Sequence, residues 1–131
     1  MTCPTCGFDA WVYVAGPYTH PDPVVNTRMA IDAGEALVAA GFVAIVPHLS
    51  LFTHLVHPHD VDYWYEYDVR LMRRCDVMLR LLGPSFGADG EAAAAETMSL
   101  PIFFGTAEEF IASHKSCVRC GAMLPALRAA G

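Results

Sequence analysis

The sequence lacks two features that would define broad functional classes: a long apolar run and an excess of positive charge. Its 131 residues include 8 Lys and Arg against 14 Asp and Glu, which gives a formal net charge of −6. No uninterrupted apolar run reaches about 18 residues, the length needed for a membrane-spanning helix. Nucleic-acid binders gain most of their affinity from Lys and Arg contacts to phosphates. We therefore expect no membrane span and no nucleic-acid partner, whereas a small phosphorylated ligand needs only a few local donors.

The chain also lacks a low-complexity linker, an internal repeat and a basic segment followed by an apolar core at its start. The last of these absences argues against a secretory signal and favours a cytoplasmic location. Hydrophobic residues make up 54% and charged residues 17% of the sequence, which excludes a disordered chain. The length suits one ordinary domain with its own core. We expect a single domain over residues 1–131, with its core at about residues 10–114.

Cysteine is scarce, but four of the five cysteines form two matching pairs. Cys3 and Cys6, and then Cys117 and Cys120, each stand in a Cys-X-X-Cys-Gly segment. This spacing lets two thiolates hold one Zn²⁺, and two pairs supply four ligands if the ends of the fold meet. Two local disulfides or a redox pair are the alternatives, and a reducing compartment disfavours the disulfides. We predict a shared zinc site; Cys75 is expected to be a small core residue.

The rest of the chain alternates short apolar runs with segments of helical periodicity. Strands are expected at residues 10–15, 42–46, 76–82 and 101–104, each followed directly by Gly or Pro. Helices are expected at residues 24–40, 60–74, 91–99 and 106–114. Residues 48–59, which hold four histidines, form either a short helix or a functional loop. The alternation predicts a flavodoxin- or Rossmann-like doubly wound parallel sheet of four to five strands, with helices on both faces.

This topology indicates where a ligand would bind. In open parallel sheets, ligands bind beyond the carboxyl ends of the strands. The loops after residues 15, 46 and 82 lie at that edge, so Tyr18, the histidines and Ser85 are expected to converge there. The cysteine pairs fall at the opposite edge, where residues 1–7 and 116–121 would form a zinc knuckle. We therefore expect the zinc to be structural.

The segment GPSFGADGEAAAAE, residues 83–96, combines a glycine-rich turn with an alanine-rich helix. Exposed N–H groups at a helix start bind anions, and Ser85 adds a hydroxyl donor. Glu91 is expected in the first helical turn, where it is either an ordinary partner of the helix dipole or a reactive group. Asp68 favours the second alternative, because it interrupts an apolar helical stripe and is costly to bury without a function. Glycosyl transfer uses two such carboxylates.

Five segments carry a resemblance to a known family. They are VYVAGPY (12–18), NTR (26–28), PHLSLFTHL (47–55), EYDVRLMRRCD (66–76) and PSFGADGE (84–91). Together they resemble the nucleoside 2-deoxyribosyltransferase superfamily and, within it, the nucleoside 5′-monophosphate N-glycosidases such as the cytidylate and hydroxymethylcytidylate hydrolases. The resemblance covers about residues 11–105 and is specific as a combination. The cysteine pairs are not part of the family pattern.

The resemblance implies roles for individual residues. Glu91 matches the nucleophile that attacks the anomeric carbon, Asp68 the second acid, and Tyr13 the tyrosine that orients the glutamate. The implied substrate-binding residues are Gly16, Tyr18, His48, Phe52, His54, Trp64, Ser85, Gly87 and Asp89. A serine at position 85 matches the monophosphate hydrolases, because a hydroxyl can donate to a phosphate that a carboxylate would repel. Asp89 places a negative charge on the same loop, and the phosphate interpretation does not explain it.

The implied protein is a homodimer that hydrolyses the N-glycosidic bond of a nucleoside 5′-monophosphate, with a neighbouring subunit contributing to the site. Structural zinc is the only expected cofactor, and no catalytic metal is needed. Two other functions are open: a transferase that exchanges bases, and a non-catalytic nucleotide-binding or zinc-dependent interaction module. The histidines and Trp64 also have ordinary alternatives, as solvated loop residues and as core or dimer interface.

Overall fold

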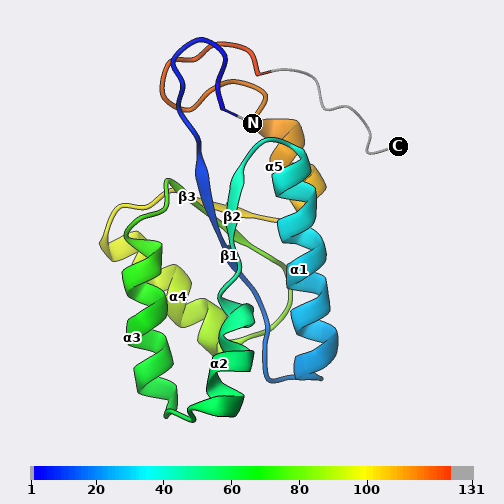
Figure 1. Ribbon diagram of the computed structural model, residues 1–131, viewed down its shortest axis with the longest axis vertical. Coiled ribbons are helices and arrows are strands. Elements are labelled where there is room, and N and C mark those ends of the chain that lie inside the picture. The colour runs from blue at the N-terminus through cyan, green and yellow to red at the C-terminus, as the bar shows by residue number, and fades with distance from the viewer. Residues whose placement is uncertain (1, 125–131) are drawn as a thin grey trace.

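The computed structural model describes residues 2–124, which form a four-stranded parallel sheet with helices on both faces (Figure 1). The strands are β1 (Trp11–Ala15), β2 (Val43–Ile45), β3 (Val77–Arg80) and β4 (Ile102–Phe104), in the order β2-β1-β3-β4. The helices are α1 (Pro23–Ala39), α2 (Leu51–Val56), α3 (Val61–Met72), α4 (Phe86–Thr97) and α5 (Ala107–Ser113). The predicted α/β fold with a parallel sheet is confirmed.

The two central strands, β1 and β3, divide the core into two clusters. Because successive residues of a strand point to opposite faces, Val12 and Val14 pack towards α1 and α5, whereas Tyr13 and Ala15 pack towards α3 and α4. Strand β3 alternates in the same way and is buried along its whole length. Burial on both faces explains why these strands are almost continuously apolar in sequence.

Short polar side chains fix the starts of the longer helices. Asp22 caps α1, Asp60 caps α3 and Ser85 caps α4, each by accepting a hydrogen bond from a backbone N–H of the first turn. The expected start of α4 was wrong: the helix begins at Phe86, directly after its cap. Gly87 and Gly90 lie inside the helix instead of forming a turn before it, so Glu91 lies in the second turn.

The segment after β2 contains a 3₁₀ turn at Pro47–Ser50, which leads directly into α2. Of the two alternatives for residues 48–59, the short helix is therefore the one that forms. The chain segments before β1 and after α5 lie side by side at the far end of the molecule from α2 (Figure 1). Residue 1 of the predicted knuckle lies outside the described range. Within that range, no helix combines the length and the apolar character that crossing a membrane requires.

Candidate functional site

A pocket of about 750 Å³ opens at the carboxyl ends of the strands. This is the edge at which ligands bind in open parallel sheets, and the volume suits a small molecule. Nine residues predicted from the sequence line it: Gly16 and Tyr18 after β1, His48 from the 3₁₀ turn, His54 from α2, Trp64 and Asp68 from α3, and Ser85, Gly87 and Glu91 from α4. The fold therefore gathers segments that are far apart in the chain around one cavity.

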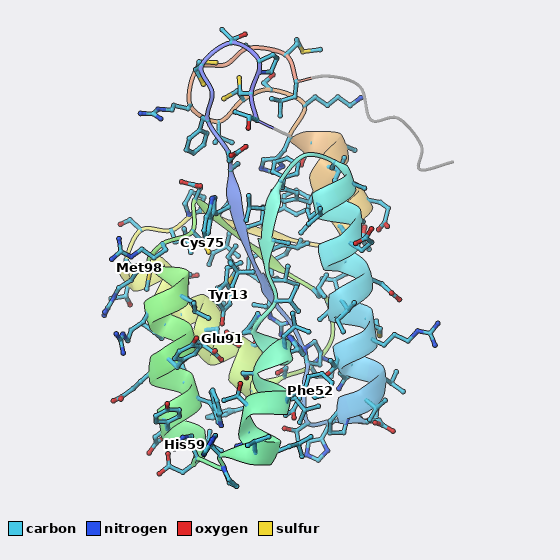
Figure 2. The ribbon with its side chains drawn as sticks, viewed as in Figure 1. Tyr13, Phe52, His59, Cys75, Glu91 and Met98 are labelled. Atoms are coloured by element: carbon cyan, nitrogen blue, oxygen red, sulfur yellow. The ribbon has the colours of Figure 1, made fainter. Side chains whose placement is uncertain are left out.

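The pocket contains two carboxyl groups, one of which accepts a hydrogen bond from a buried tyrosine. The Tyr13 hydroxyl donates a hydrogen bond to Oε2 of Glu91, and Tyr13 itself is fully buried beneath α4. Figure 2 shows these two side chains next to each other at the centre of the molecule. Oδ1 of Asp68 is buried and has no hydrogen-bond partner among the described residues. The site thus holds one oriented carboxyl group and one with unused hydrogen-bonding capacity.

The two carboxyl groups titrate far from their ordinary range. Burial raises the pKa of Glu91 to about 7, although the Tyr13 hydrogen bond and the Arg80 charge act in the opposite direction. Burial, and then the charge of Glu91, raises the pKa of Asp68 to about 7. Burial and the negative charges of both acids raise the pKa of Tyr13 well above its usual value, so its hydroxyl stays protonated.

The surroundings of the two acids assign their protonation. Glu91 accepts a hydrogen bond and is close to a guanidinium, both of which stabilise its carboxylate form. Asp68 has neither aid and is repelled by Glu91, so the surroundings favour the protonated form of Asp68 more than that of Glu91. Such a pair can supply one carboxylate and one proton donor, the two groups that acid/base chemistry at a sugar centre uses.

His48 fixes one wall of the pocket. Its Nε2 lies 2.9 Å from the carbonyl oxygen of Pro17, and because a carbonyl only accepts, Nε2 carries the proton. Burial lowers the pKa of His48, which keeps the ring neutral. Nδ1 is therefore an acceptor, and it is buried without a partner in the described part of the chain. The ring also meets Tyr18 edge-on, with centroids 5.9 Å apart, so His48 holds the loop after β1 in place.

The opposite wall is aromatic and comes from α2 and α3. Nε1 of Trp64 donates to Nδ1 of His54 at 2.8 Å, and the backbone N–H of His59 donates to the same atom at 3.2 Å. With Nδ1 accepting twice, the proton of the neutral His54 ring lies on Nε2. This leaves an N–H donor on a residue that lines the pocket. The wall offers a ligand both aromatic faces and a hydrogen-bond donor.

Two predicted substrate-binding residues lie outside the lining of the pocket. Phe52 is on α2 with 70% of its surface exposed. Asp89 instead accepts a hydrogen bond from Arg80 at 3.1 Å. This ion pair accounts for the acidic residue that a phosphate loop alone does not explain. Sequence reasoning overlooked Arg80, and the available signal was a basic residue at the end of the apolar run VMLR, nine positions before an acid.

Asn26 is a second residue whose role sequence reasoning did not identify. Its side chain is buried, and Nδ2 donates to the carbonyl oxygens of Tyr18 at 3.0 Å and His20 at 2.9 Å. These bonds tie the pocket loop to the first turn of α1. Gly16 completes the loop, because a Cβ there would lie 3.3 Å from the side chain of Leu81. The pocket wall therefore depends on small and buried polar residues as well as on those that face the ligand.

The four cysteines meet at the other end of the molecule, as predicted. The sulfur atoms of Cys3, Cys6, Cys117 and Cys120 all lie within 4.8 Å of one another, and the pairs Cys3–Cys120 and Cys6–Cys117 are each 3.7 Å apart. A tetrahedral site with metal–sulfur bonds of about 2.3 Å places its sulfurs about 3.8 Å apart. The same spacing is too long for a disulfide. The cluster fits a metal ion such as zinc.

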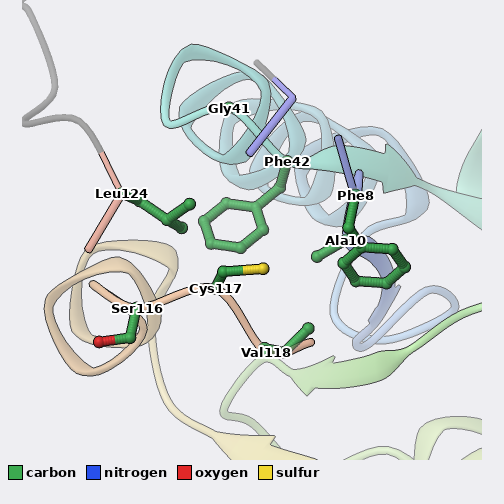
Figure 3. Close-up of a pocket in the computed structure, with 8 residues that line it drawn as sticks. All are labelled: Phe8, Ala10, Gly41, Phe42, Ser116, Cys117, Val118 and Leu124. Atoms are coloured by element: carbon green, nitrogen blue, oxygen red, sulfur yellow. The ribbon is translucent and has the colours of Figure 1, made fainter. Parts of the chain in front are cut away.

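Each cysteine pair is shaped by the same backbone turn. The glycine that follows each pair donates its N–H to the carbonyl of the first cysteine at 2.9 Å, and both Gly7 and Gly121 adopt positive φ. The backbone N–H of Cys120 lowers the pKa of Cys117 to about 6, which favours the thiolate. Cys117 also packs beneath Phe42 and beside Leu124, which joins the cluster to the core of the domain (Figure 3).

No protein-family model matches the sequence, and no curated protein matches it significantly.

Proposed function

We propose that the protein hydrolyses the N-glycosidic bond of a nucleoside 5′-monophosphate and releases the free base and a sugar 5-phosphate. One observation carries this proposal: Glu91, oriented by Tyr13, shares a pocket with Asp68, whose Oδ1 is buried without a partner among the described residues. A nucleophilic carboxylate beside an acid is the arrangement used for retaining glycosyl transfer. The resemblance to the nucleoside 2-deoxyribosyltransferase superfamily points to the same reaction.

In the first step, a carboxylate oxygen of Glu91 attacks the anomeric carbon while the bond from that carbon to the base breaks. The electron pair of the broken bond stays on the base nitrogen, and the base receives the proton of Asp68. The product is an ester between Glu91 and the sugar. The Tyr13 hydrogen bond holds the attacking group in line, so less orientational freedom has to be lost on the way to the transition state.

In the second step, water attacks the same carbon and gives a proton to Asp68, which is now ionised. The ester bond breaks, and Glu91 leaves as a carboxylate. Two inversions give net retention at the anomeric carbon. Asp68 thus acts first as an acid and then as a base, and its pKa of about 7 suits both roles near neutral pH.

The start of α4 is the proposed phosphate site. The Ser85 hydroxyl caps the helix, and the backbone N–H groups of Phe86 and Gly87 follow it at the positive end of the helix dipole. Ser85 and Gly87 both line the pocket. No residue in the described lining is Lys or Arg, which favours a second candidate: base exchange on an uncharged nucleoside by the same Glu91 chemistry.

The outer surface of α2 supports a homodimer. None of the residues of α2 is buried, and the exposed fractions of Phe52 and Val56 are 70% and 72%. Val61, at the start of α3, is 82% exposed and also lines the pocket. Large apolar side chains exposed on one short helix and the start of the next are the composition expected of an interface. A second copy packed here would cover the pocket opening from the side of α2.

We assign the four-cysteine cluster a structural role, with zinc as its ion. All four ligand positions are thiolates, which leaves no open position for a substrate. The cluster lies at the opposite edge of the sheet from the carboxyl pair, and it joins the two ends of the described chain (Figure 1). No step of the proposed reaction involves it.

The test is a substrate panel. The protein is incubated with ribo- and deoxyribonucleosides and their 5′-monophosphates, with and without a second free base, and products are separated chromatographically. Free base from monophosphates, lost in Glu91→Gln and kept in the matched surface variant Glu96→Gln, supports the hydrolase. Exchange of bases without net hydrolysis overturns the hydrolase and supports the transferase. Binding without turnover of any substrate overturns both and leaves a non-catalytic binding module.

A further inference from the structure

Arg80 is a buried cation that the proposed reaction does not use. It ends β3 and is only 5% exposed. Its guanidinium donates hydrogen bonds to the carbonyl oxygen of Leu81, to that of Gly83 at 3.0 Å, and to Oδ1 of Asp89 at 3.1 Å. A buried charge is costly unless it is paired and hydrogen-bonded. The contacts show what it is paired with: the turn between β3 and α4, and the first turn of α4 itself.

The strand register places Arg80 on the same face of the sheet as the catalytic tyrosine. Tyr13 pairs with Met78, and Ala15 pairs with Arg80. Alternate residues of a strand share a face, so Arg80 points to the side on which Tyr13 is bonded to Glu91. Asp89 and Glu91 lie two positions apart in α4, with Asp89 bound to the arginine. The guanidinium therefore lies under the helix that carries the nucleophile.

The turn held by Arg80 has little freedom to take another shape. Gly83 has a φ of 125°, a conformation that favours glycine, and a Cβ there would lie 3.0 Å from the ring of Pro17. Its carbonyl accepts from the arginine. The strand end, this turn and the first turn of α4 are thus joined through one side chain. The N–H groups proposed to hold the phosphate and the carboxylate proposed to attack the sugar are both set by it.

The hydrogen bonds of Arg80 leave part of its charge uncompensated. Its Nε is buried and has no partner among the described residues. Its counter-ion Asp89 is exposed, with 74% of the side-chain surface accessible, so water screens that charge. Glu91 lies on the same side of the sheet, and the positive charge of Arg80 lowers its pKa.

We propose that Arg80 is a positioning residue of the site: it fixes the turn that leads into α4, and its buried positive charge holds Glu91 in the carboxylate form. Asp89 is the counter-charge that limits this effect. The catalytic consequence rests on the proposed function, whereas the electrostatic effect on Glu91 does not.

The groups around Glu91 are few, so their effects can be separated. Tyr13 faces it from β1, Asp68 from α3, Arg80 from β3, and Asp89 precedes it on its own helix. Burial sets the elevated pKa of Glu91, and both Tyr13 and Arg80 lower it. The negative charge of Glu91 in turn raises the pKa of Asp68.

The experiment measures the titration of Glu91 directly, in the absence of substrate. Protein labelled with ¹³C at the glutamate side-chain carboxyl is titrated by NMR, and the Glu91→Gln spectrum assigns the signal. We expect Arg80→Gln to raise the midpoint of Glu91 by about one pH unit, because an opposite charge is lost. Asp89→Asn keeps an acceptor for Arg80 but removes the counter-charge, so it lowers the midpoint by about half a unit. Glu96→Gln makes the same charge change on the exposed side of α4 and leaves the midpoint unchanged.

Arg80→Lys separates charge from geometry. It keeps the wild-type midpoint of Glu91, but cannot bond Leu81, Gly83 and Asp89 together, so the apparent affinity for a 5′-monophosphate falls several-fold. Shifts of the same sign in Arg80→Gln and Asp89→Asn, or no shift in either, overturn the proposal. If Arg80→Gln does not fold, the downward shift in Asp89→Asn decides alone. An inactive protein that shows the opposed shifts overturns the proposed function and leaves the role of Arg80 intact.

Discussion

The two ends of the sheet handle buried polar groups in opposite ways. At the carboxyl edge, Oδ1 of Asp68 and Nδ1 of His48 are buried without partners within residues 2–124. At the amino edge, each pair of thiols is shaped by its own backbone turn, and the four sulfurs meet at the spacing of a metal site. The first region keeps hydrogen-bonding capacity unused, whereas the second commits all of its ligands to one another.

Unpartnered polar groups lower stability but are free to bind a ligand, and committed ones stabilise but cannot. We therefore expect changes at the carboxyl edge to affect turnover with little loss of stability. Changes at the cysteine cluster should lower stability with little effect on turnover.

The largest expected effect is that of Glu91→Gln on turnover. The amide is nearly isosteric but is a poor nucleophile, so kcat should fall by about 10³-fold or more. The thermal midpoint should stay the same or rise, because a buried acid is replaced by a neutral group. Steady-state release of base and differential scanning calorimetry measure the two quantities.

Glu96→Gln, an exposed carboxylate on the same helix, should change neither quantity. A Glu91→Gln protein that turns over normally would remove the nucleophile from the proposal. A Glu91→Gln protein that unfolds would instead show that changes at the carboxyl edge affect stability as much as changes at the cysteine cluster do.

Removal of the metal is expected to have the next largest effect, and on stability only. Cys117→Ser, or chelation of the native protein, should lower the thermal midpoint by about 10 °C, because the ion joins the two ends of the described chain. Metal analysis should find one zinc per wild-type chain. Turnover per folded molecule should be unchanged below the new midpoint.

Cys75→Ala is the matched control, since this cysteine lies in the core and outside the cluster. It should keep its zinc. The structural assignment is contradicted if reduced wild-type protein contains no metal, or if chelation abolishes turnover while the fold persists.

The contrast also explains what could be predicted from the sequence. The strands were predictable because burial on both faces makes them apolar, and the parallel order followed from their alternation with helices. The cysteine cluster was predictable because two identical short motifs need one another. In both cases local sequence and tertiary structure require the same residues.

The carboxyl edge was harder because its residues act through partners far away in the chain. Ser85 is a helix cap, and with Gly87 and Gly90 inside the helix the sequence suggested a later start than Phe86. Asp89 had no explanation until Arg80 was found opposite it, since a single charge in a strand does not reveal its counter-ion. Prediction failed where glycines and charges are used against their usual local preferences.

A smaller effect is expected in the pH dependence of stability. Burial raises the pKa of both Asp68 and Glu91 to about 7, so between about pH 4 and pH 7 the folded state binds more protons than the unfolded chain. The stabilisation of the folded state that these two acids provide is fully present below about pH 4 and is lost as the pH rises through about 7. We expect the thermal midpoint to fall across this window, and Asp68→Asn to reduce the decline by about half.

Calorimetry across this range, with Glu66→Gln as the exposed control on the same helix, makes the measurement. An Asp68→Asn protein whose midpoint follows wild type at every pH would show that Asp68 is solvated and ionised. Asp68 would then not be the unfavourably buried acid that distinguishes the carboxyl edge from the cysteine cluster.

The smallest predicted effect concerns the aromatic wall. Trp64→Phe keeps an aromatic ring but removes the N–H that donates to Nδ1 of His54 at 2.8 Å, so only the longer hydrogen bond from the backbone N–H of His59, at 3.2 Å, still holds the His54 ring. One hydrogen bond of about 1 kcal/mol predicts a rise in KM of about 3- to 10-fold, with kcat nearly unchanged. Trp11→Phe, a control on β1, should leave both constants as they are. A KM equal to that of wild type in Trp64→Phe, or a loss in kcat alone, contradicts this role. A change confined to KM would place the wall in substrate binding and leave the chemistry to the carboxyl pair.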